Sequence, residues 1–182
     1  MPSGLIFLAE GAEEMELVIT ADVLRRAGVD VVIAGVAGDG PVKCSNKVTV
    51  VPDKSLSEAV SKHYDILICP GGAKGSETLC KSKEVGAALQ DQEKRGGFIA
   101  AVCAAPTALV AHNIAKGKKL TSYPGMADKF KDYKYLEERV VVDGKLITSR
   151  GPGTTFEFAL AIVEQLVGKE KVQSLTSGLV LK

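Results

Sequence analysis

Residues 96–117 read GGFIAAVCAAPTALVAHNIAKG, and this segment predicts a strand, a sharp turn and a helix. Phe98 to Val102 is a short apolar run, which is typical of a strand buried on both faces of a parallel sheet. Pro106 has no N–H group to donate and a fixed φ, so it suits the first turn of a helix. We expect that helix over Thr107 to Ala115. Cys103 therefore lies at the hinge between strand and helix.

The position of Cys103 favours a reactive thiol for three reasons. In open α/β sheets, ligands bind beyond the carboxyl ends of the strands. The N-terminus of a helix presents free N–H groups and a partial positive charge, which stabilise a thiolate. A tight strand-to-helix turn also exposes a nucleophile, as in the nucleophile elbow of hydrolases. An inert core cysteine is the alternative, and position alone leaves both interpretations open.

The composition is that of an ordinary globular domain. The chain has 182 residues, of which 46% are hydrophobic and 25% are charged, and its net charge is +1. This length suits a single domain over residues 1–182 with a sizeable core. A nearly neutral chain without an aromatic-rich basic patch gives no support for nucleic-acid binding. No apolar run approaches the roughly 20 residues that span a bilayer, so we expect no membrane span.

The N-terminus and the cysteines favour an intracellular protein with free thiols. Residues 1–14 lack the basic region and the long apolar run of a signal peptide. The four cysteines, Cys44, Cys69, Cys80 and Cys103, show no CxxC spacing. A disulfide framework is therefore disfavoured. We expect Cys69 in the core and Cys80 at the surface or half-buried.

Expected strands and helices alternate along the chain. Strands are expected at 4–9, 31–36, 64–69, 98–102 and 119–122, and helices at 13–27, 56–60, 76–94, 107–115 and 154–167, with a last short helix after 169. Two hairpins are expected, at 42–51 and around Asp143-Gly144 at 139–148. This order predicts an α/β fold of flavodoxin-like, doubly wound type, in which a mainly parallel sheet carries helices on both faces.

The helix expected at 154–167 has the clearest sequence signals. Thr154 and Glu157 have the spacing of a capping box. Phe156, Leu160, Val163 and Val167 recur at helical spacing and predict its buried stripe.

Acidic and glycine residues follow two other predicted strands. Glu13, Glu14 and Glu16 crowd the first turn of the first helix, where favourable interaction with the helix dipole suffices to explain two of them. We expect Glu16 to point into the cleft at the carboxyl edge of the sheet. Gly71 and Gly72 follow the third strand, where bare backbone N–H groups can hold an oxyanion or a small carboxylate. A plain turn is the alternative.

The chain offers Cys103 few partners. Neither His63, before a strand, nor His112, nine residues further along, is placed to reach the sulfur, so a Cys–His dyad is disfavoured and both histidines are expected at the surface. No His/Cys cluster has metal-ligand spacing, so no metal site is predicted. A protonated Glu16 can donate to the thiolate, which lowers the pKa of Cys103 and raises its own. Such a site favours attack on small carbonyl compounds and oxidation of the sulfur.

Four motifs together resemble one family. They are GAEEME at 11–16, PGG at 70–72, AAVCAAPTAL at 100–109 and TSRGPGT at 148–154. They closely resemble the animal Parkinson disease protein 7 (protein deglycase) family of the PfpI-like superfamily, over essentially the whole chain. The resemblance implies a homodimer of flavodoxin-like subunits that needs no cofactor, with a redox-sensitive Cys103 hydrogen-bonded to Glu16.

The resemblance also implies a function. Members are credited with protection against oxidative and carbonyl stress and with redox-dependent chaperone activity. They are also credited with glyoxalase and deglycase activity on methylglyoxal and glyoxal adducts of protein side chains and nucleotides. They occur in the cytoplasm, nucleus and mitochondria. By the same resemblance, Pro152 lines the site and Cys44 is a secondary oxidation site near the dimer interface.

The sequence departs from the family pattern at three positions. Tyr123 stands where the family often has a histidine near the cysteine, and a phenol is a poor base at neutral pH because its pKa is about 10. Ala105 replaces a glycine two residues after the cysteine. Asn46 replaces a basic residue that crosses the dimer toward the glutamate, so a neutral contact between subunits is expected.

Two functions remain open. In the first, Cys103 attacks an aldehyde, Glu16 moves protons, and the N–H groups of Gly71, Gly72 and Ala104 hold the oxyanion. In the second, the protein is a non-enzymatic sensor and chaperone whose Cys103 is oxidised to a sulfinate. A cysteine peptidase is disfavoured, because the dyad is missing and because the apolar tail covers the site in the resembled family.

Overall fold

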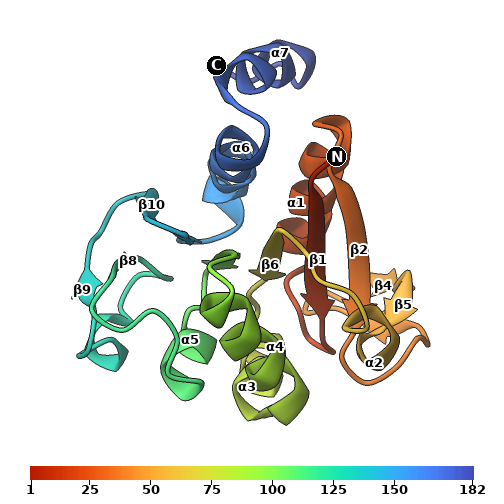
Figure 1. The fold of residues 1–182 in the computed structure, drawn as a ribbon, viewed down its shortest axis with the longest axis vertical. Coiled ribbons are helices and arrows are strands. Elements are labelled where there is room, and N and C mark those ends of the chain that lie inside the picture. Colours follow the sequence, from red (N-terminus) through yellow and green to blue (C-terminus); the bar gives the residue numbers. More distant parts are fainter.

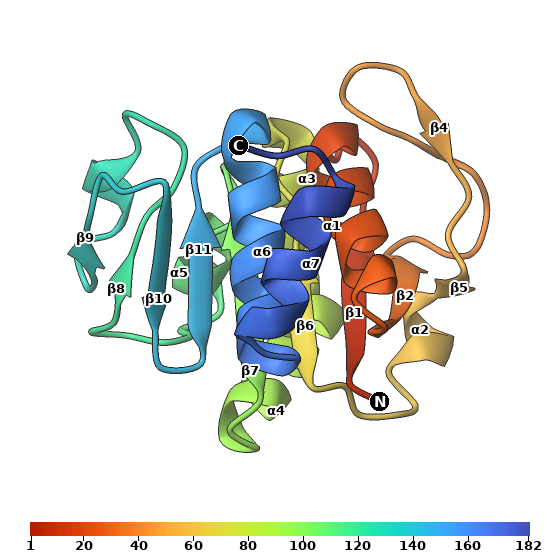
Figure 2. The same cartoon turned by 90° about the horizontal axis from the view of Figure 1, so that it is seen from above.

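The computed structural model describes residues 1–182 and shows an α/β sandwich built on one central sheet (Figures 1 and 2). Five parallel strands lie in the order β2-β1-β6-β7-β11, with β10 antiparallel at one edge and β5 parallel at the other. Their bounds are β1 Ser3–Leu8, β2 Asp30–Gly35, β5 Lys54–Ser55, β6 Ile66–Cys69, β7 Phe98–Val102, β10 Val140–Asp143 and β11 Leu146–Ser149. This arrangement confirms the predicted flavodoxin-like fold.

Helices cover both faces of the sheet (Figure 2). One face carries α1 (Glu14–Arg26), α6 (Thr155–Leu166) and α7 (Lys169–Gly178), and the other carries α2 (Leu56–Ala59), α3 (Ala73–Lys81), α4 (Lys83–Lys94) and α5 (Thr107–Ala111). Residues alternate between these faces along β1: Leu5 and Phe7 pack in one buried cluster, and Ile6 and Leu8 pack in the other. Because successive side chains of a strand point to opposite faces, both sides of the central strands must be apolar.

Two small inserts lie outside the central sheet. The predicted hairpin at 42–51 is confirmed, with β3 (Val42–Lys43) antiparallel to β4 (Thr49–Val50). Its turn places Lys47 in the left-handed region, at φ 73°. The strand expected at 119–122 is only β8 (Lys119–Leu120), which pairs with β9 (Lys134–Tyr135) on either side of the 3-10 helix η1 (Ala127–Lys129). The hairpin of β10 and β11 is also confirmed.

The single helix expected at 76–94 is wrong, because Ser82 divides it into α3 and α4. The backbone of Ser82 is extended, with ψ 116°, and its hydroxyl accepts a hydrogen bond from the Val85 N–H. Ser82 is therefore the N-cap of α4, a role that serine favours.

The helix expected at 107–115 is also shorter than predicted, since α5 ends at Ala111. Asn113 and Ala115 both adopt left-handed backbone conformations, at φ 57° and 55°, which no helix can continue through. The apolar composition of this segment concealed the break.

The capping box predicted for α6 is wrong. Thr154 ends the 3-10 helix η2 (Pro152–Thr154), and its hydroxyl accepts the Gly151 N–H. Glu157 instead pairs with Arg139.

The predicted stripe of α6 is confirmed at Val163, which is buried, and in part at Leu160, which is half-buried against the core. The buried residues of this helix are Thr155, Phe158, Ala159, Ile162 and Val163. Phe156 and Val167 are exposed, because the helix faces the sheet through a neighbouring row of side chains.

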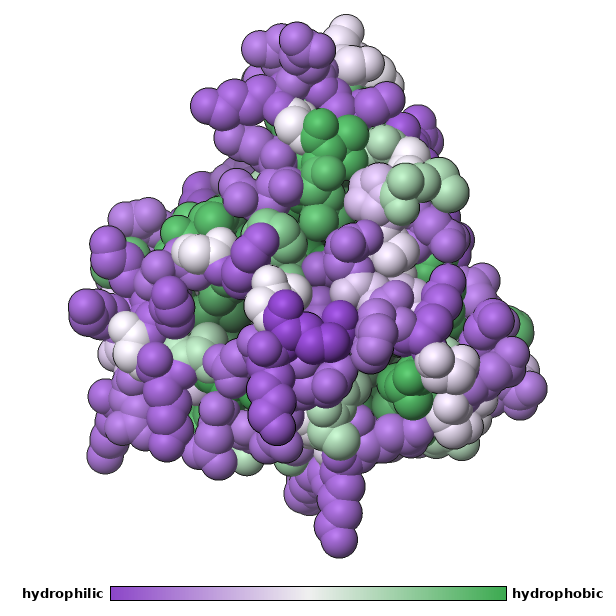
Figure 3. All heavy atoms as spheres, in the orientation of Figure 1, coloured by the Kyte–Doolittle hydropathy of each residue, from purple (hydrophilic) through white to green (hydrophobic).

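Hydrophilic side chains cover most of the face in Figure 3, and a hydrophobic strip is visible in its upper half. No helix in the structure combines the length and the hydropathy needed to cross a bilayer.

Candidate active site

Cys103 occupies a sharp turn between β7 and α5 at the carboxyl edge of the sheet. Its φ is 63°, in the left-handed region, which is strained for a residue with a side chain. Two backbone hydrogen bonds hold it there: its N–H donates to the Ser149 carbonyl (3.1 Å), and its carbonyl accepts the Tyr123 N–H (2.8 Å). The turn leaves the thiol half-buried rather than sealed in the core.

The three acids at the start of α1 have separate roles. Glu13 is the N-cap and accepts the Met15 N–H. Glu14 accepts the Asn46 N–H (2.9 Å), which ties the β3–β4 hairpin to the helix. Glu16 is the most deeply buried of the three, at 0% exposed.

Glu16 meets the loop that follows β6. Its Oε2 accepts the Gly71 N–H at 2.7 Å, and the Cys103 thiol beside it lowers the pKa of the carboxyl group. Its other oxygen, Oε1, is buried without any further hydrogen-bond partner. A proton on this carboxyl group would let it donate to the sulfur, as the sequence suggested.

Only glycine fits at positions 71 and 72. A Cβ on Gly71 would lie 2.6 Å from both Cys103 Cβ and Glu16 Oε2. Gly72 has φ 87°, and a Cβ there would lie 2.4 Å from the Gly11 carbonyl oxygen. The two glycines thus let the backbone approach the thiol closely.

One of the three N–H groups expected to hold an oxyanion is already occupied. The N–H groups of Gly72 and Ala104 both lower the pKa of the Cys103 thiol, so they are the donors available to negative charge at the sulfur. The Gly71 N–H is taken up by Glu16 and is not free to hold an oxyanion. Gly71 therefore positions the acid, and two of the three expected donors remain.

Burial dominates the electrostatics of Glu16. Desolvation raises the pKa of its carboxyl group to about 7, against the lowering effect of the Gly71 N–H and the Cys103 thiol. The Glu16 carboxyl group therefore keeps its proton well above the pH at which an ordinary glutamate loses it.

The Cys103 thiol does not show the lowered pKa that the sequence suggested. Burial raises its pKa first, and the negative charge of Glu16 raises it further, while the N–H groups of Gly72 and Ala104 lower it. The contribution from Glu16 exists only while that carboxyl group is ionised. The two groups therefore titrate as a pair that shares one proton. When Glu16 holds that proton, Cys103 is a thiolate.

Tyr123 and Pro152 lie around this turn. The Tyr123 side chain is 51% exposed and lies over the loop at Gly151, where an added Cβ would be 3.9 Å from its Cδ2. Pro152 is half-buried at the start of η2. The C-terminus lies at this same end of the sheet (Figure 2).

Asn46 and Cys44 belong to the β3–β4 hairpin. The Asn46 amide donates to Glu13 Oε2 (3.2 Å). Within the chain, this uncharged side chain therefore binds a carboxylate. Cys44 is 4% exposed, and burial followed by the charge of Glu14 raises the pKa of its thiol. Its role as a secondary oxidation site stays a prediction.

The remaining thiols and histidines have no part in the site. Cys69 is fully buried, and burial raises its pKa to about 12, while Cys80 is half-buried. His63 is exposed beside Asp91, whereas His112 is half-buried rather than at the surface, with Nε2 2.8 Å from the Leu79 carbonyl oxygen. No group of three or more His, Cys, Asp or Glu side chains is placed to hold a metal ion.

Sequence reasoning missed the role of Arg150. Its Nε donates to the Ser122 carbonyl (3.0 Å), which fixes the loop carrying Tyr123 against the loop after β11. The only signal in the sequence was a lone cation in a glycine-rich loop.

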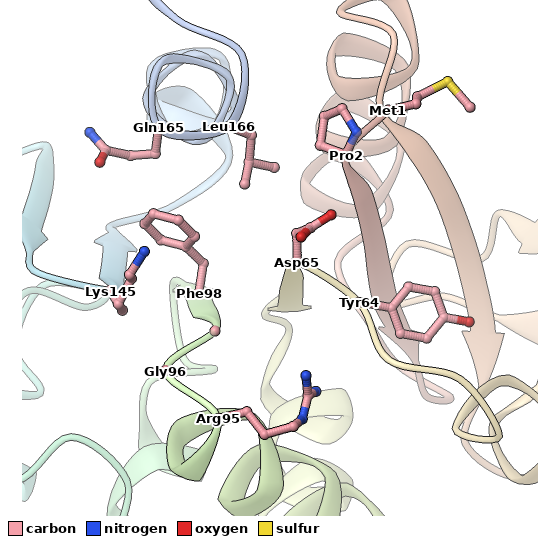
Figure 4. A pocket seen from close by; sticks show the side chains of 11 residues that line it. Met1, Pro2, Tyr64, Asp65, Arg95, Gly96, Phe98, Lys145, Gln165 and Leu166 are labelled. Carbon is pink, nitrogen blue, oxygen red and sulfur yellow. The ribbon is translucent and has the colours of Figure 1, made fainter.

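The largest surface hollow lies elsewhere. It has a volume of about 590 Å³ and is lined by the starts of β6 and β7, with Asp65, Phe98 and Lys145 around it (Figure 4). This is the amino edge of the sheet, opposite Cys103. In this fold the carboxyl edge carries the ligand chemistry, so we place the active site at Cys103.

Comparison with known proteins identifies the family of this chain. Residues 3–165 match the DJ-1/PfpI family. This chain belongs to the DJ-1/PfpI family. Protein dj-1beta of Drosophila melanogaster is 53% identical over 98% of this chain and 97% of its own length, and the Parkinson disease protein 7 homolog of Danio rerio is 53% identical over 98% and 96%. These matches confirm the resemblance stated from the motifs.

Within the DJ-1/PfpI family, solved structures share the whole fold. The crystal structure of Drosophila melanogaster DJ-1beta has a TM-score of 0.98 at 52% identity, and covers 100% of this chain and 98% of that one. A Caenorhabditis elegans relative, 46% identical over 98% of this chain and 96% of its own length, is named "Glutathione-independent glyoxalase DJR-1.2".

Proposed function

We propose that this protein converts small α-oxoaldehydes such as methylglyoxal to hydroxy acids without glutathione, and that it removes their adducts from protein side chains and nucleotides. The observation that carries the proposal is the grouping of a half-buried thiol, a carboxyl group with a pKa of about 7, and the Gly72 and Ala104 N–H groups, which lower the pKa of the thiol. The name of the Caenorhabditis elegans relative supports the same chemistry.

The reaction needs only these groups and water. The Cys103 thiolate adds to the aldehyde carbon, while the N–H groups of Gly72 and Ala104 stabilise the alkoxide. Glu16 then moves a proton from the former aldehyde carbon to the neighbouring carbonyl carbon, so that the first carbon is oxidised to a thioester and the second is reduced to an alcohol. Water hydrolyses the thioester, which releases lactate and restores the thiol.

Lactate formation tests the proposal. Purified protein and methylglyoxal without glutathione should give lactate, and both Cys103→Ser and Glu16→Gln should lose turnover. Cys80→Ser is the matched control because it removes a half-buried thiol outside the grouping. Equal rates for Cys103→Ser and the unmodified protein would contradict the proposal.

The adduct activity is tested separately. Protein should restore free lysine and arginine side chains in methylglyoxal-treated peptide, measured by mass spectrometry after free aldehyde has been removed. If adducts disappear equally fast with the unmodified protein and with the Cys103→Ser control, the function is restricted to free aldehydes.

A redox sensor and chaperone is the second candidate, and the partial exposure of Cys103 favours it. Two equivalents of peroxide convert the thiol to a sulfinic acid with release of two waters. The sulfinate oxygens would meet the Gly72 and Ala104 N–H groups and a protonated Glu16. Mass spectrometry of Glu16→Gln separates the candidates: retained sulfinate formation with lost lactate production indicates distinct roles for Glu16.

We also propose that the protein forms a homodimer. The outer face of α1 exposes Met15 and Val18, at 50% and 48%, and the neighbouring hairpin segment exposes Val48 and Val51. Pairing of two copies would cover these side chains. Light scattering should give twice 19.1 kDa, and a Met15→Glu/Val18→Glu variant should give the monomer mass.

A further inference from the structure

A second hollow, of about 370 Å³, opens at the carboxyl edge of the sheet. Gly11, from the loop after β1, and Ala73, at the start of α3, line one side. The β3–β4 hairpin lines the other side, and Figure 2 shows that hairpin projecting at the end of the sheet where β1 terminates.

Three lysines make this hollow positive. Lys43, Lys47 and Lys74 line it, with Glu10 as the one acidic residue among its lining side chains. Lys74 pairs with Glu10 at 3.2 Å, whereas Lys43 and Lys47 form no salt bridge. Two lysine charges are therefore left without a partner.

The other carboxylates nearby form no salt bridge with these lysines. Glu13 accepts from Met15, Ser45 and Asn46, and Glu14 accepts from the hydroxyl of Ser45 and the N–H groups of Asn46 and Val48. Both carboxylates are satisfied by neutral donors at the base of the hairpin. Their negative charges remain and reach Cys44 in the same hollow, but the lining side chains themselves carry three positive charges against one negative charge, and this excess favours an anion.

The hollow adjoins the proposed oxyanion donors. Gly11 packs so closely on Gly72 that a Cβ on Gly72 would lie 2.4 Å from the Gly11 carbonyl oxygen, and the Gly72 N–H lowers the pKa of the Cys103 thiol. A neighbouring hollow of about 390 Å³ shares Glu10 and Lys43 and extends over Gly38 and Pro41. The space beside the lysines thus exceeds what a lone small anion requires.

We propose that Lys43, Lys47 and Lys74 form a phosphate-binding subsite that holds phosphate-bearing ligands next to Cys103. Lysine ammonium groups bind phosphate as strong point charges, and two unpaired ones can neutralise a phosphate monoester dianion. That the ligand is a substrate rests on the proposed function: an aldehyde adduct on a nucleotide would be recruited through its phosphate.

Direct binding tests the subsite without any turnover. Inorganic phosphate and GMP are titrated into the full chain at low salt, with amide NMR shifts and calorimetry as readouts. Shifts should concentrate at Gly11, Lys47 and Ala73, and Lys43→Gln/Lys47→Gln should weaken binding at least about tenfold. Lys129→Gln/Lys131→Gln is the control: it removes the same charge from two exposed lysines between β8 and β9, on the opposite side of the sheet. Equal weakening by both variants, or no binding by the unmodified protein, would overturn the proposal.

Activity then tests whether the ligand is a substrate. Methylglyoxal adducts of GMP and of guanosine carry the same modified base and differ only in the phosphate. The unmodified protein should have a KM at least about fivefold lower for the GMP adduct, and Lys43→Gln/Lys47→Gln should abolish this difference. Turnover of both adducts with equal KM would overturn substrate recruitment. Loss of turnover on both adducts with lysine-dependent phosphate binding intact would count against the proposed function and support the subsite.

Discussion

The Glu16 carboxyl group accepts the Gly71 N–H at 2.7 Å, and this bond fixes the acid against the Cys103 turn. It ties the first helix to the loop after the third core strand, 55 residues along the chain. The acid is buried at the cost of a raised pKa, and the thiol beside it cannot ionise independently. The chemistry of the site follows from that proton shared between two side chains.

Stability should fall as the pH rises through the titration of Glu16. The pKa of Glu16 is about 7 in the folded protein and 4.5 for an ordinary glutamate. Between these pH values the folded state therefore binds more protons than the unfolded state. The contribution of Glu16 to the free energy of unfolding is fully present below about pH 4.5 and is lost as the pH rises through 7. The pKa shift corresponds to about 3 kcal/mol. Urea unfolding across this range should show the loss in the unmodified protein and not in Glu16→Gln. Parallel profiles for the two proteins would contradict the assignment.

A methyl group at position 71 should disrupt the site. Gly71→Ala forces a Cβ to 2.6 Å from Cys103 Cβ and Glu16 Oε2, so we expect about 1–3 kcal/mol of destabilisation together with loss of turnover. Gly153→Ala is the control, because no atom lies within 4 Å of its added Cβ. Thermal unfolding measures both, and a fully stable Gly71→Ala would show that the turn relaxes more freely than its geometry implies.

Replacement of Tyr123 by histidine should accelerate the proposed reaction. Histidine has an ordinary pKa of about 6.5, so at neutral pH it can shuttle protons that a phenol cannot. We expect a higher kcat for Tyr123→His and an unchanged kcat for Tyr123→Phe, measured by lactate release. A lower kcat for Tyr123→His would assign Tyr123 a direct role.

Thiol labelling should follow burial. Cys69 is fully buried with a pKa of about 12, and Cys44 is 4% exposed, whereas Cys80 and Cys103 are half-buried. Brief iodoacetamide treatment of the folded protein, read by peptide mass spectrometry, should modify Cys103 and Cys80 and spare Cys69. Early modification of Cys69 would indicate that the core opens readily.

The sequence predicted the features that depend on local composition. Apolar runs such as Phe98 to Val102 identified the core strands, and the Pro-Gly-Gly turn identified the loop beside the thiol. Glu16 could be selected because the helix dipole needs only two of the three acids at the start of α1.

Features set by tertiary contacts could not be predicted. Ser82 breaks an otherwise continuous helical pattern through a single side-chain cap, and the register of α6 differs from the strongest apolar stripe. The pairing of the Gly71 N–H with Glu16, which removes an expected oxyanion donor, depends on the distance between two loops. The raised pKa of Cys103 likewise depends on burial, which no motif encodes.

The pH dependence of Cys103 alkylation tests the central claim most directly. The rate is measured from pH 5 to 10, with Cys103→Ser used to subtract the other thiols. Because the pair releases its first proton near the pKa of Glu16, the account predicts a midpoint near 7, and Glu16→Gln should displace it. A midpoint at or above the ordinary thiol value of about 8.5, unchanged in Glu16→Gln, would show that Cys103 and Glu16 share no proton.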